Sequence, residues 1–194
     1  STVVPELERE YDAMAGRYLD HATILVGPGL RTGMPIRIDN PRELGADRLV
    51  NAIAAYERFH SACVVVDFGT SINYDVVSDD GEFLGGIIAP GVEISMEALH
   101  QRAAKLVRVD LERPRGVIGK STIDSVRSGV VYGFAGLVDG IVERVRGELG
   151  EDTRAVATGG LAEFIVPCCE SIDEVDDLLT LTGLRLLYER NAAA

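Results

Sequence analysis

The sequence predicts an α/β protein in which helices flank a mixed sheet. Residues 62–89 read as three consecutive strands joined by tight turns, which is typical of an antiparallel meander. Apolar residues at helical spacing dominate the chain after this meander. A further short apolar strand, at residues 155–160, is inserted among those helices. A meander followed by helices and a late strand favours a sheet that contains both parallel and antiparallel neighbours.

Two helices and a short strand are predicted ahead of the meander. Residues 5–19 and residues 43–59 both carry apolar side chains at helical spacing. Between them, residues 22–27 form an apolar run that ends at a Gly-Pro-Gly turn, which predicts a strand. Residues 28–41 are rich in Gly and Pro and are expected to form a loop. The inward side chains would be Leu7, Tyr11, Met14 and Tyr18 in the first helix and Leu44, Leu49, Ile53 and Tyr56 in the second.

The meander itself consists of predicted strands at residues 62–69, 72–78 and 82–89. Gly69 ends the first strand in a tight turn, and Asp79-Asp80-Gly81 is a strong hairpin signal between the second and third. Pro-Gly after the third strand stops it.

Helices are predicted over residues 94–106, 121–133 and 134–149, and a last helix is expected from residue 172 or later. The strand at residues 155–160 ends at a double glycine. The chain shows neither an internal repeat nor a low-complexity linker.

Composition excludes some classes of function. The formal net charge of −12 argues against nucleic acid as the main partner, because a phosphate backbone needs a cationic face. A small anionic ligand stays possible, since a local site can differ from the global field. No run reaches the roughly 18–20 apolar residues of a membrane helix, and the acidic residues 1–10 do not resemble a signal peptide. A cytoplasmic protein without a membrane partner is therefore expected.

Three cysteines, Cys63, Cys168 and Cys169, lack the spacing of a zinc site. A disulfide between the adjacent pair would strain the backbone. All three are expected to be reduced thiols.

Asp67-Phe68-Gly69-Thr70 closes the first strand of the meander and is a candidate polyphosphate site. A carboxylate at the end of a buried strand is held rigidly, and Gly69 lacks the side chain that would block a phosphate from the backbone. Thr70 adds a hydroxyl and an amide. The competing interpretation is an ordinary hairpin turn, in which Asp-x-Gly is common.

Two further glycine pairs end or interrupt strands. Thr158-Gly159-Gly160 would let a flat ring lie against the main chain, although turns from strand to helix often carry glycine anyway. Gly85-Gly86 is equally well explained by close packing within the sheet.

Gly45-Ala46-Asp47-Arg48 places an acid and a base side by side near the start of a helix. The planar fork of Arg48 suits a carboxylate, but a solvated acid–base pair on a helix surface is the simpler interpretation without context. Lys120-Ser121-Thr122 precedes another helix and could be only its cap. The spacing of a complete GxxxxGK[ST] phosphate loop is not present there.

Taken in order, these segments resemble the type III pantothenate kinases, once grouped with the Bvg accessory factors. The order and spacing of the motifs make the resemblance specific, and it covers nearly the whole chain. The matching segments are Thr32–Pro35, Asp39–Arg48, Asp67–Thr70, Gly85–Gly91, Gly119–Thr122, Ala157–Leu161 and Leu181–Arg185.

The resemblance implies an actin-like ATPase (ribonuclease H-like) fold and an ATP-dependent phosphorylation of pantothenate, the first step towards coenzyme A. By that resemblance, Asp47 is the catalytic proton acceptor and Asp67 binds a monovalent cation, K⁺ or NH₄⁺. Mg²⁺ would accompany ATP, and the family is generally a homodimer with its substrate pocket at the subunit interface. The implied pantothenate site comprises Gly45, Ala46, Asp47, Arg48 and Thr122. The implied ATP site comprises Gly69, Thr70, Thr158, Gly159 and Gly160.

The sequence departs from the family pattern in three places. The family opens with a strand and an Asp-x-Gly-Asn loop, the first phosphate motif, and nothing similar precedes residue 28. Residues 1–60 are therefore expected to be the remainder of a first actin-like subdomain whose N-terminal part is absent, and residues 61–194 the second subdomain. Ser71-Ile72-Asn73-Tyr74 replaces a common Ala-Thr-Thr-Phe, and Ile38 stands where many members place a substrate-contacting tyrosine.

Three hypotheses follow from the sequence. The favoured one is an active pantothenate kinase. The second is an actin-like module that binds nucleotide or a partner without turnover, or an impaired enzyme. The third is a kinase of the same superfamily acting on a sugar or another carboxylate.

Overall fold

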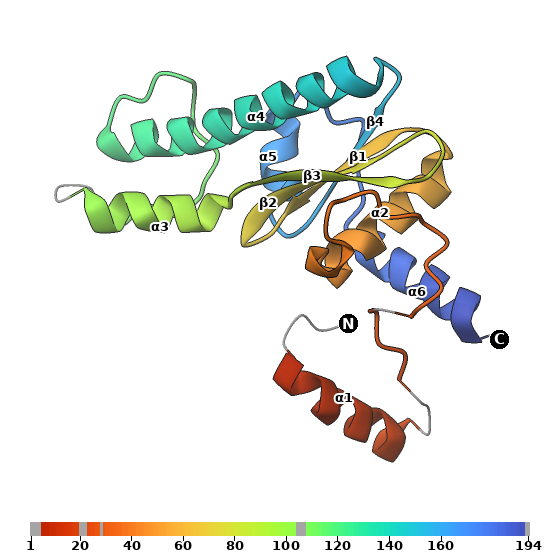
Figure 1. Cartoon of the computed structure of the whole chain (residues 1–194). Helices are drawn as coiled ribbons and strands as arrows, with labels where there is room; N and C mark the ends of the chain where they lie inside the picture. The colour runs from red at the N-terminus through yellow and green to blue at the C-terminus, as the bar shows by residue number, and fades with distance from the viewer. Residues whose placement is uncertain (1–4, 20–22, 28, 104–107, 193–194) are drawn as a thin grey trace.

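A five-stranded mixed sheet organises the chain in the computed structural model, which describes residues 5–19, 23–27, 29–103 and 108–192 (Figure 1). The strand order is β3-β2-β1-β4-β5. The strands are β1 (Cys63–Phe68), β2 (Ser71–Val77), β3 (Phe83–Pro90), β4 (Arg154–Thr158) and β5 (Glu174–Val175).

Strand pairing confirms both the meander and the mixed sheet. β1 pairs antiparallel with β2, and β2 pairs antiparallel with β3. β4 lies parallel to β1 on the other side, and β5 is parallel to β4. β1 is therefore an interior strand, and its continuous run of valines is buried on both faces as such a strand requires.

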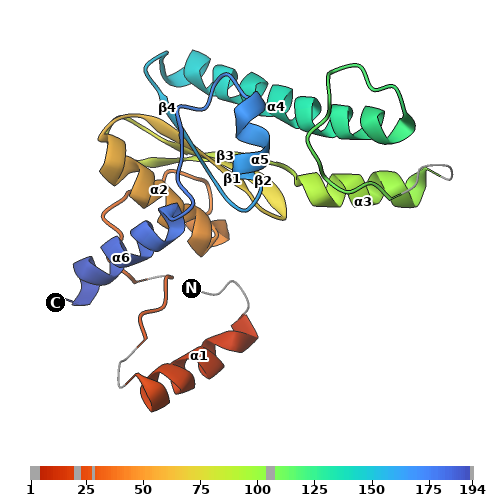
Figure 2. The ribbon, with the colours of Figure 1, turned by 180° about the vertical axis from the view of Figure 1, so that it is seen from behind.

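Helices cover both faces of the sheet. α2 and α6 lie on one face, and α4 and α5 lie on the other, while α3 extends away from the end of β3 (Figures 1 and 2). The helices are α1 (Pro5–Tyr18), α2 (Ala46–Phe59), α3 (Val92–Arg102), α4 (Thr122–Leu149), α5 (Ala162–Ile165) and α6 (Leu179–Ala192), with 3₁₀ turns η1 (Pro41–Glu43) and η2 (Val166–Cys168).

Alternation along β1 divides the core into two clusters. Val64 and Val66 face the cluster under α4 and α5, whereas Cys63 and Val65 face the cluster under α2 and α6. Cys63 is one of three free thiols in the structure. No helix among the described residues is long and apolar enough to cross a membrane.

Some expected elements differ in the structure. The strand predicted at residues 22–27 is wrong for its described part, because residues 23–27 form no strand and pair with none. Leu25 is 54% exposed there, so the apolar run lacks the burial that a strand of this composition needs. The predicted helix at 94–106 starts earlier, at Val92, and ends at Arg102; residues 104–107 lie outside the described residues.

The two helices predicted at 121–133 and 134–149 are one continuous helix, α4. Gly133 does not interrupt it, because Val131, Ala135 and Val138 form one buried stripe that packs on the sheet across the glycine. The last helix, α6, begins only at Leu179, after the short strand β5.

α1 confirms the predicted first helix, but its apolar face is not covered. The helix lies apart from the layers around the sheet (Figures 1 and 2). The exposed side chains are Leu7, Tyr11, Met14 and Tyr18.

Contact between α2 and α6 depends on a glycine. A β-carbon at Gly183 would lie 2.1 Å from the carbonyl oxygen of Val50, which belongs to the backbone of α2 and cannot move aside alone. We expect Gly183→Ala to lower the free energy of unfolding by about 1–3 kcal/mol, measured by urea denaturation. Gly147→Ala in α4 is the control, because nothing lies within 4 Å of its added carbon and higher helix propensity should raise stability by up to about 1 kcal/mol. Equal stability of the two variants would contradict this account of the α2–α6 contact.

Candidate active site

The carboxyl ends of the parallel strands β1 and β4 bring two of the predicted motifs together. Asp67 lies directly opposite Thr158 in the strand register. Ligands of open α/β sheets commonly bind beyond such strand ends. The Asp67–Thr70 and Thr158–Gly160 segments therefore share one edge of the sheet.

Gly159 makes this approach possible. Its φ of 94° lies in the region that favours glycine, and a β-carbon there would be 2.6 Å from both Asp67 Oδ1 and the carbonyl oxygen of Phe68. Gly160 has open space around its α-carbon. The backbone at residues 158–160 thus lies close against the Asp67 carboxylate.

Gly69 and Gly91 hold the turn after β1 in place. The amide of Gly69 donates to the carbonyl of Ser71 at 3.0 Å, and the amide of Gly91 donates to the carbonyl of Thr70 at 3.1 Å. A β-carbon at Gly91 would lie 2.2 Å from that Thr70 oxygen. Gly69 and Thr70 stay exposed at the rim of the sheet, where a ligand can reach them.

The start of α2 places Asp47 beside the same strand end. Asp47 lies in the first turn of the helix, and its Oδ1 accepts the backbone N–H of Arg48 at 2.9 Å. Gly45 precedes it as the N-cap, and a β-carbon there would be 2.6 Å from Asp47 Oδ1. The negative charge of Asp47 helps to raise the pKa of Asp67, so the two carboxylates lie within electrostatic reach of one another.

Asn51, one turn further along α2, was not predicted as a site residue. Its Nδ2 donates to Asp67 Oδ2 at 3.1 Å, and its Oδ1 accepts from the hydroxyl of Thr180 at 2.7 Å. Asn51 is fully buried, so this single amide joins α2, β1 and α6. Its position four residues after Asp47, on the same helix face, was the available signal.

The environment of Asp67 opposes its charge. Burial is the main cause that raises the pKa of this carboxyl above its ordinary value, and the charge of Asp47 adds to the effect. The hydrogen bond from Asn51 works in the opposite direction. A cation bound at Asp67 would offset the cost of keeping this carboxylate ionised.

Arg48 forms a buried ion pair that was also not predicted. Its Nε donates to Asp75 Oδ1 at 2.6 Å, and the Asp75 side chain has no exposed surface. Burial, as the largest cause, raises the pKa of Asp75 to about 6 despite the opposing effect of Arg48. A charged residue in the otherwise buried strand β2 was the signal in the sequence, because such charges are rare unless they are paired.

Thr122 is not joined to this group. It is the exposed first residue of α4, and its neighbour Ser121 caps the helix by accepting the amide of Asp124 at 3.1 Å. Ser121 is therefore the N-cap of α4, while the role of Thr122 stays a prediction. This end of α4 lies beside the far part of α3, beyond the sheet (Figure 1), and neither a hydrogen bond nor an ion pair between described residues links Thr122 to Asp47.

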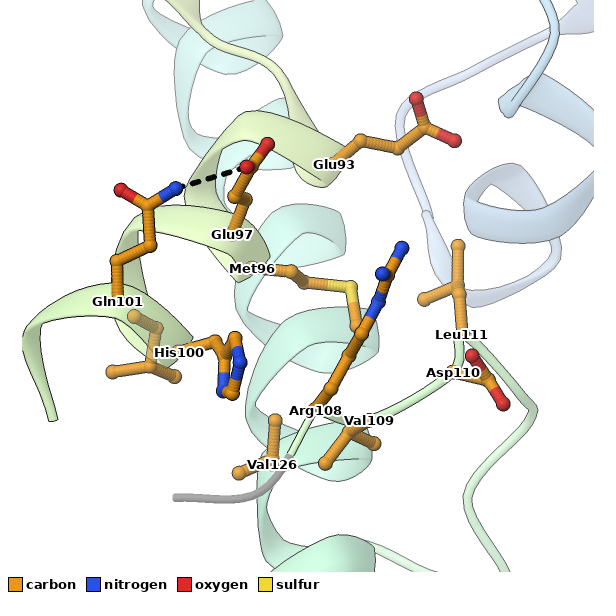
Figure 3. Close-up of a pocket in the computed structure, with 11 residues that line it drawn as sticks. Glu93, Met96, Glu97, His100, Gln101, Arg108, Val109, Asp110, Leu111 and Val126 are labelled. Atoms are coloured by element: carbon orange, nitrogen blue, oxygen red, sulfur yellow. Dashed lines mark hydrogen bonds between the residues drawn. The ribbon is translucent and has the colours of Figure 1, made fainter. Parts of the chain in front are cut away.

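An open hollow of about 440 Å³ lies between α3 and the segment before α4 (Figure 3). Glu93 and Glu97 of α3 line it together with Arg108, whose side chain extends into the space. None of the predicted site residues lines this hollow, so it is separate from the carboxylate group.

The donor set does not form a multi-carboxylate metal centre. Across the part of the chain that the structure describes, no three His, Cys, Asp or Glu side chains are grouped so as to hold a metal ion. A cation at Asp67 would need other oxygen ligands, such as backbone carbonyls or phosphate oxygens.

A mixed sheet flanked by helices, with an acid and two glycine turns at the ends of β1 and β4 and a second acid at the start of α2, fits a phosphotransferase with an actin-like fold. The family model described as type III pantothenate kinase matches residues 1–144. The chain belongs to the type III pantothenate kinase family.

Curated relatives named type III pantothenate kinase support this membership. The protein from Myxococcus xanthus (strain DK1622) is 53% identical over 194 residues, covering 100% of this chain and 76% of that protein. The protein from Syntrophobacter fumaroxidans is 52% identical over 192 residues, covering 98% of this chain and 74% of that protein.

A solved structure shares the fold. It comes from Campylobacter jejuni, is described as a Baf family transcriptional activator, and superposes with a TM-score of 0.64. The match covers 99% of this chain and 81% of that chain at 21% sequence identity, so it supports the fold alone.

Burial of Asp75 should appear in the pH dependence of stability. Its pKa is higher in the folded protein, about 6, than the ordinary 3.8 of an unfolded chain, so between these values the folded state holds a proton that the unfolded state has released. The stability contributed by this proton is fully present below pH 3.8 and is lost as the pH rises through about 6. The difference is on the order of 3 kcal/mol at most.

Asp75→Asn should remove this part of the pH dependence. The free energy of unfolding would be measured by urea denaturation at several pH values between about 4.5 and about 7. Asp152→Asn, at an exposed turn, is the control and should leave the slope unchanged. An unaltered slope in Asp75→Asn would show that Asp75 does not titrate in this range.

Proposed function

We propose that this protein transfers the γ-phosphoryl group of ATP to the primary hydroxyl of pantothenate, the first step towards coenzyme A. Membership in the type III pantothenate kinase family supports the reaction class. The observation that carries the proposal is the position of Asp47 at the start of α2, where its charge acts on Asp67 at the end of β1.

Asp47 is the proposed proton acceptor. Phosphoryl transfer passes through a loose transition state, so positioning and neutralisation of charge supply most of the acceleration. A carboxylate at the N-terminus of a helix keeps its negative charge favourably, and Asp47 is only partly buried. It needs only to orient the hydroxyl and to accept its proton late in the reaction.

Gly45, Ala46 and Arg48 are proposed to line the pantothenate site around Asp47. Arg48 would pair with the pantothenate carboxylate. Thr122 is proposed to contact substrate as well, and it would do so in a homodimer whose second copy brings α4 to the pocket, because one copy keeps Thr122 apart from Asp47.

ATP is proposed to bind along the shared edge of β1 and β4. Gly69 and Thr70 would contact its phosphates, and Thr158, Gly159 and Gly160 would lie against the adenosine. Close approach is supported by Gly69, Gly159 and Gly160, because these glycines have no side chain to hold the ligand away from the backbone.

Asp67 is proposed to hold a monovalent cation, K⁺ or NH₄⁺. Its carboxylate is a hard oxygen donor whose burial opposes its charge, which fits a cation ligand. Mg²⁺ would accompany ATP and neutralise phosphate charge when bound. A cytoplasmic location is proposed from the metabolic role of the family, and the division into subdomains at residue 60 stays a prediction.

A module that binds nucleotide without turnover is the competing function. Asp47, Arg48, Asp67 and Thr70 are all present, which favours the enzyme. A kinase for another small carboxylate would share the site, and substrate selectivity distinguishes the two.

Asp47→Asn should lower kcat for pantothenate phosphorylation by at least about 100-fold, because the proton acceptor is lost while shape is kept. Nucleotide affinity, measured by titration calorimetry, should change little. The assay uses the full-length protein, with Asp152→Asn as the exposed control. Turnover near that of the unsubstituted protein would remove Asp47 from the mechanism.

Replacing potassium by sodium should slow the reaction several-fold, because an oxygen cage spaced for the larger ion coordinates the smaller one poorly. Asp67→Asn should abolish the difference between the two salts. If rates in potassium and sodium agree in the unsubstituted protein, the assignment of Asp67 as cation ligand is wrong.

A further inference from the structure

Asp75 and Arg48 are bonded through one pair of atoms only. Asp75 Oδ1 accepts from Arg48 Nε, whereas Asp75 Oδ2 is buried and has no hydrogen-bond partner among the described residues. A buried carboxylate with an unpaired oxygen is costly, and a purely structural arginine–carboxylate pair is frequently bidentate. The single bond therefore needs an explanation.

Because only Nε is bonded to Asp75, the two terminal nitrogens of the Arg48 guanidinium are available to another acceptor. Neither terminal nitrogen of its guanidinium donates to any residue that the structure describes. The Arg48 side chain keeps 17% of its surface exposed, so the guanidinium edge that carries these nitrogens is shielded but not closed off. Two parallel N–H groups at such an edge match the two oxygens of a carboxylate.

Phe83 and Gly86 further limit the orientation of the Arg48 guanidinium. The ring of Phe83 lies 5.8 Å from Arg48 Cζ, at cation–π distance. Gly86 is the register partner of Asp75 in the β2–β3 ladder, and a β-carbon at this glycine would lie 2.6 Å from Arg48 Nη2. The same β-carbon would lie 2.0 Å from the carbonyl oxygen of Tyr74, so Gly86 permits the close packing of β2 and β3 and also leaves room for the guanidinium.

We propose that Asp75 is a positioning residue, which holds Arg48 through Nε so that the two terminal nitrogens face the carboxylate of the substrate. The inference rests on the proposed function, in which that substrate is pantothenate. Asp75 touches neither reactant and acts only through Arg48.

Both acids of the predicted site share the sheet face of Asp75. The negative charges of Asp67 and Asp47 both act on Asp75. Arg48, on α2, is hydrogen-bonded to Asp75 among these three carboxylates. A freely rotating Arg48 could pair with Asp47 or Asp67 instead. Fixing its Nε on β2 keeps the guanidinium away from both carboxylates that the reaction needs.

The test compares two substrates, pantothenate and its neutral primary amide, in the unsubstituted protein and in Asp75→Asn. Without Asp75 the Arg48 guanidinium should no longer be held in position. KM for pantothenate should then rise about 10- to 100-fold, which is the effect of weakening the charge-assisted pair between Arg48 and the substrate carboxylate. KM for ATP and kcat should change less than about threefold, and KM for the amide should stay the same, because the amide offers Arg48 no charge. Asp173→Asn is the matched control, since Asp173 also pairs with arginines, Arg146 and Arg154, but lies beside the first residue of β4, at the opposite end of that strand from Thr158.

An equal loss on both substrates, or no loss on pantothenate, would overturn the positioning role. Asp75→Glu is measured in the same way if Asp75→Asn fails to fold; its extra methylene displaces the guanidinium and should give the same selective rise in KM. Absence of pantothenate turnover in the unsubstituted full-length protein would instead overturn the proposed function, and the inference with it. The two failures are thus distinguishable.

Discussion

The first two turns of α2 are anchored to the sheet by polar contacts, and the candidate site depends on that anchoring. Arg48 reaches Asp75 on β2, and Asn51 reaches Asp67 on β1. Because these contacts are one turn apart, they set both the rotation of the helix and its distance from the strands. Asp47 directly precedes Arg48 in α2, so its position is determined by contacts that it does not itself make.

The same region concentrates negative charge in a protein that is already acidic. The charge of Asp47 acts on Asp67, the charges of both act on Asp75, and burial raises the pKa of Asp67 and of Asp75. Such an arrangement is unfavourable in the isolated chain, yet it suits a site that receives cations with a polyphosphate. The apolar packing of α2 and α6 around Val50 and Val65 offsets this electrostatic cost.

Glycines set the approach of a ligand as much as the charged groups do. Gly159 lets the main chain of one strand end lie against Asp67, and Gly91 holds the turn that exposes Thr70. Gly86 has a different role, because it makes room for the Arg48 guanidinium behind the acids. In each case the missing β-carbon creates the space.

The sequence by itself determined the meander, the late strand, most of the helices and the motifs at Asp47, Asp67 and Thr158, because these depend on local periodicity and turn chemistry. It predicted a strand at residues 22–27 and a break at Gly133, since local patterns cannot show whether a run finds a partner or whether a stripe continues across a glycine. Only the tertiary structure joined Asn51 to Asp67 and Arg48 to Asp75, residues 16 and 27 positions apart in the chain. Such contacts are decided by how α2 docks on the sheet, and that docking is a property of the packed core rather than of any one segment.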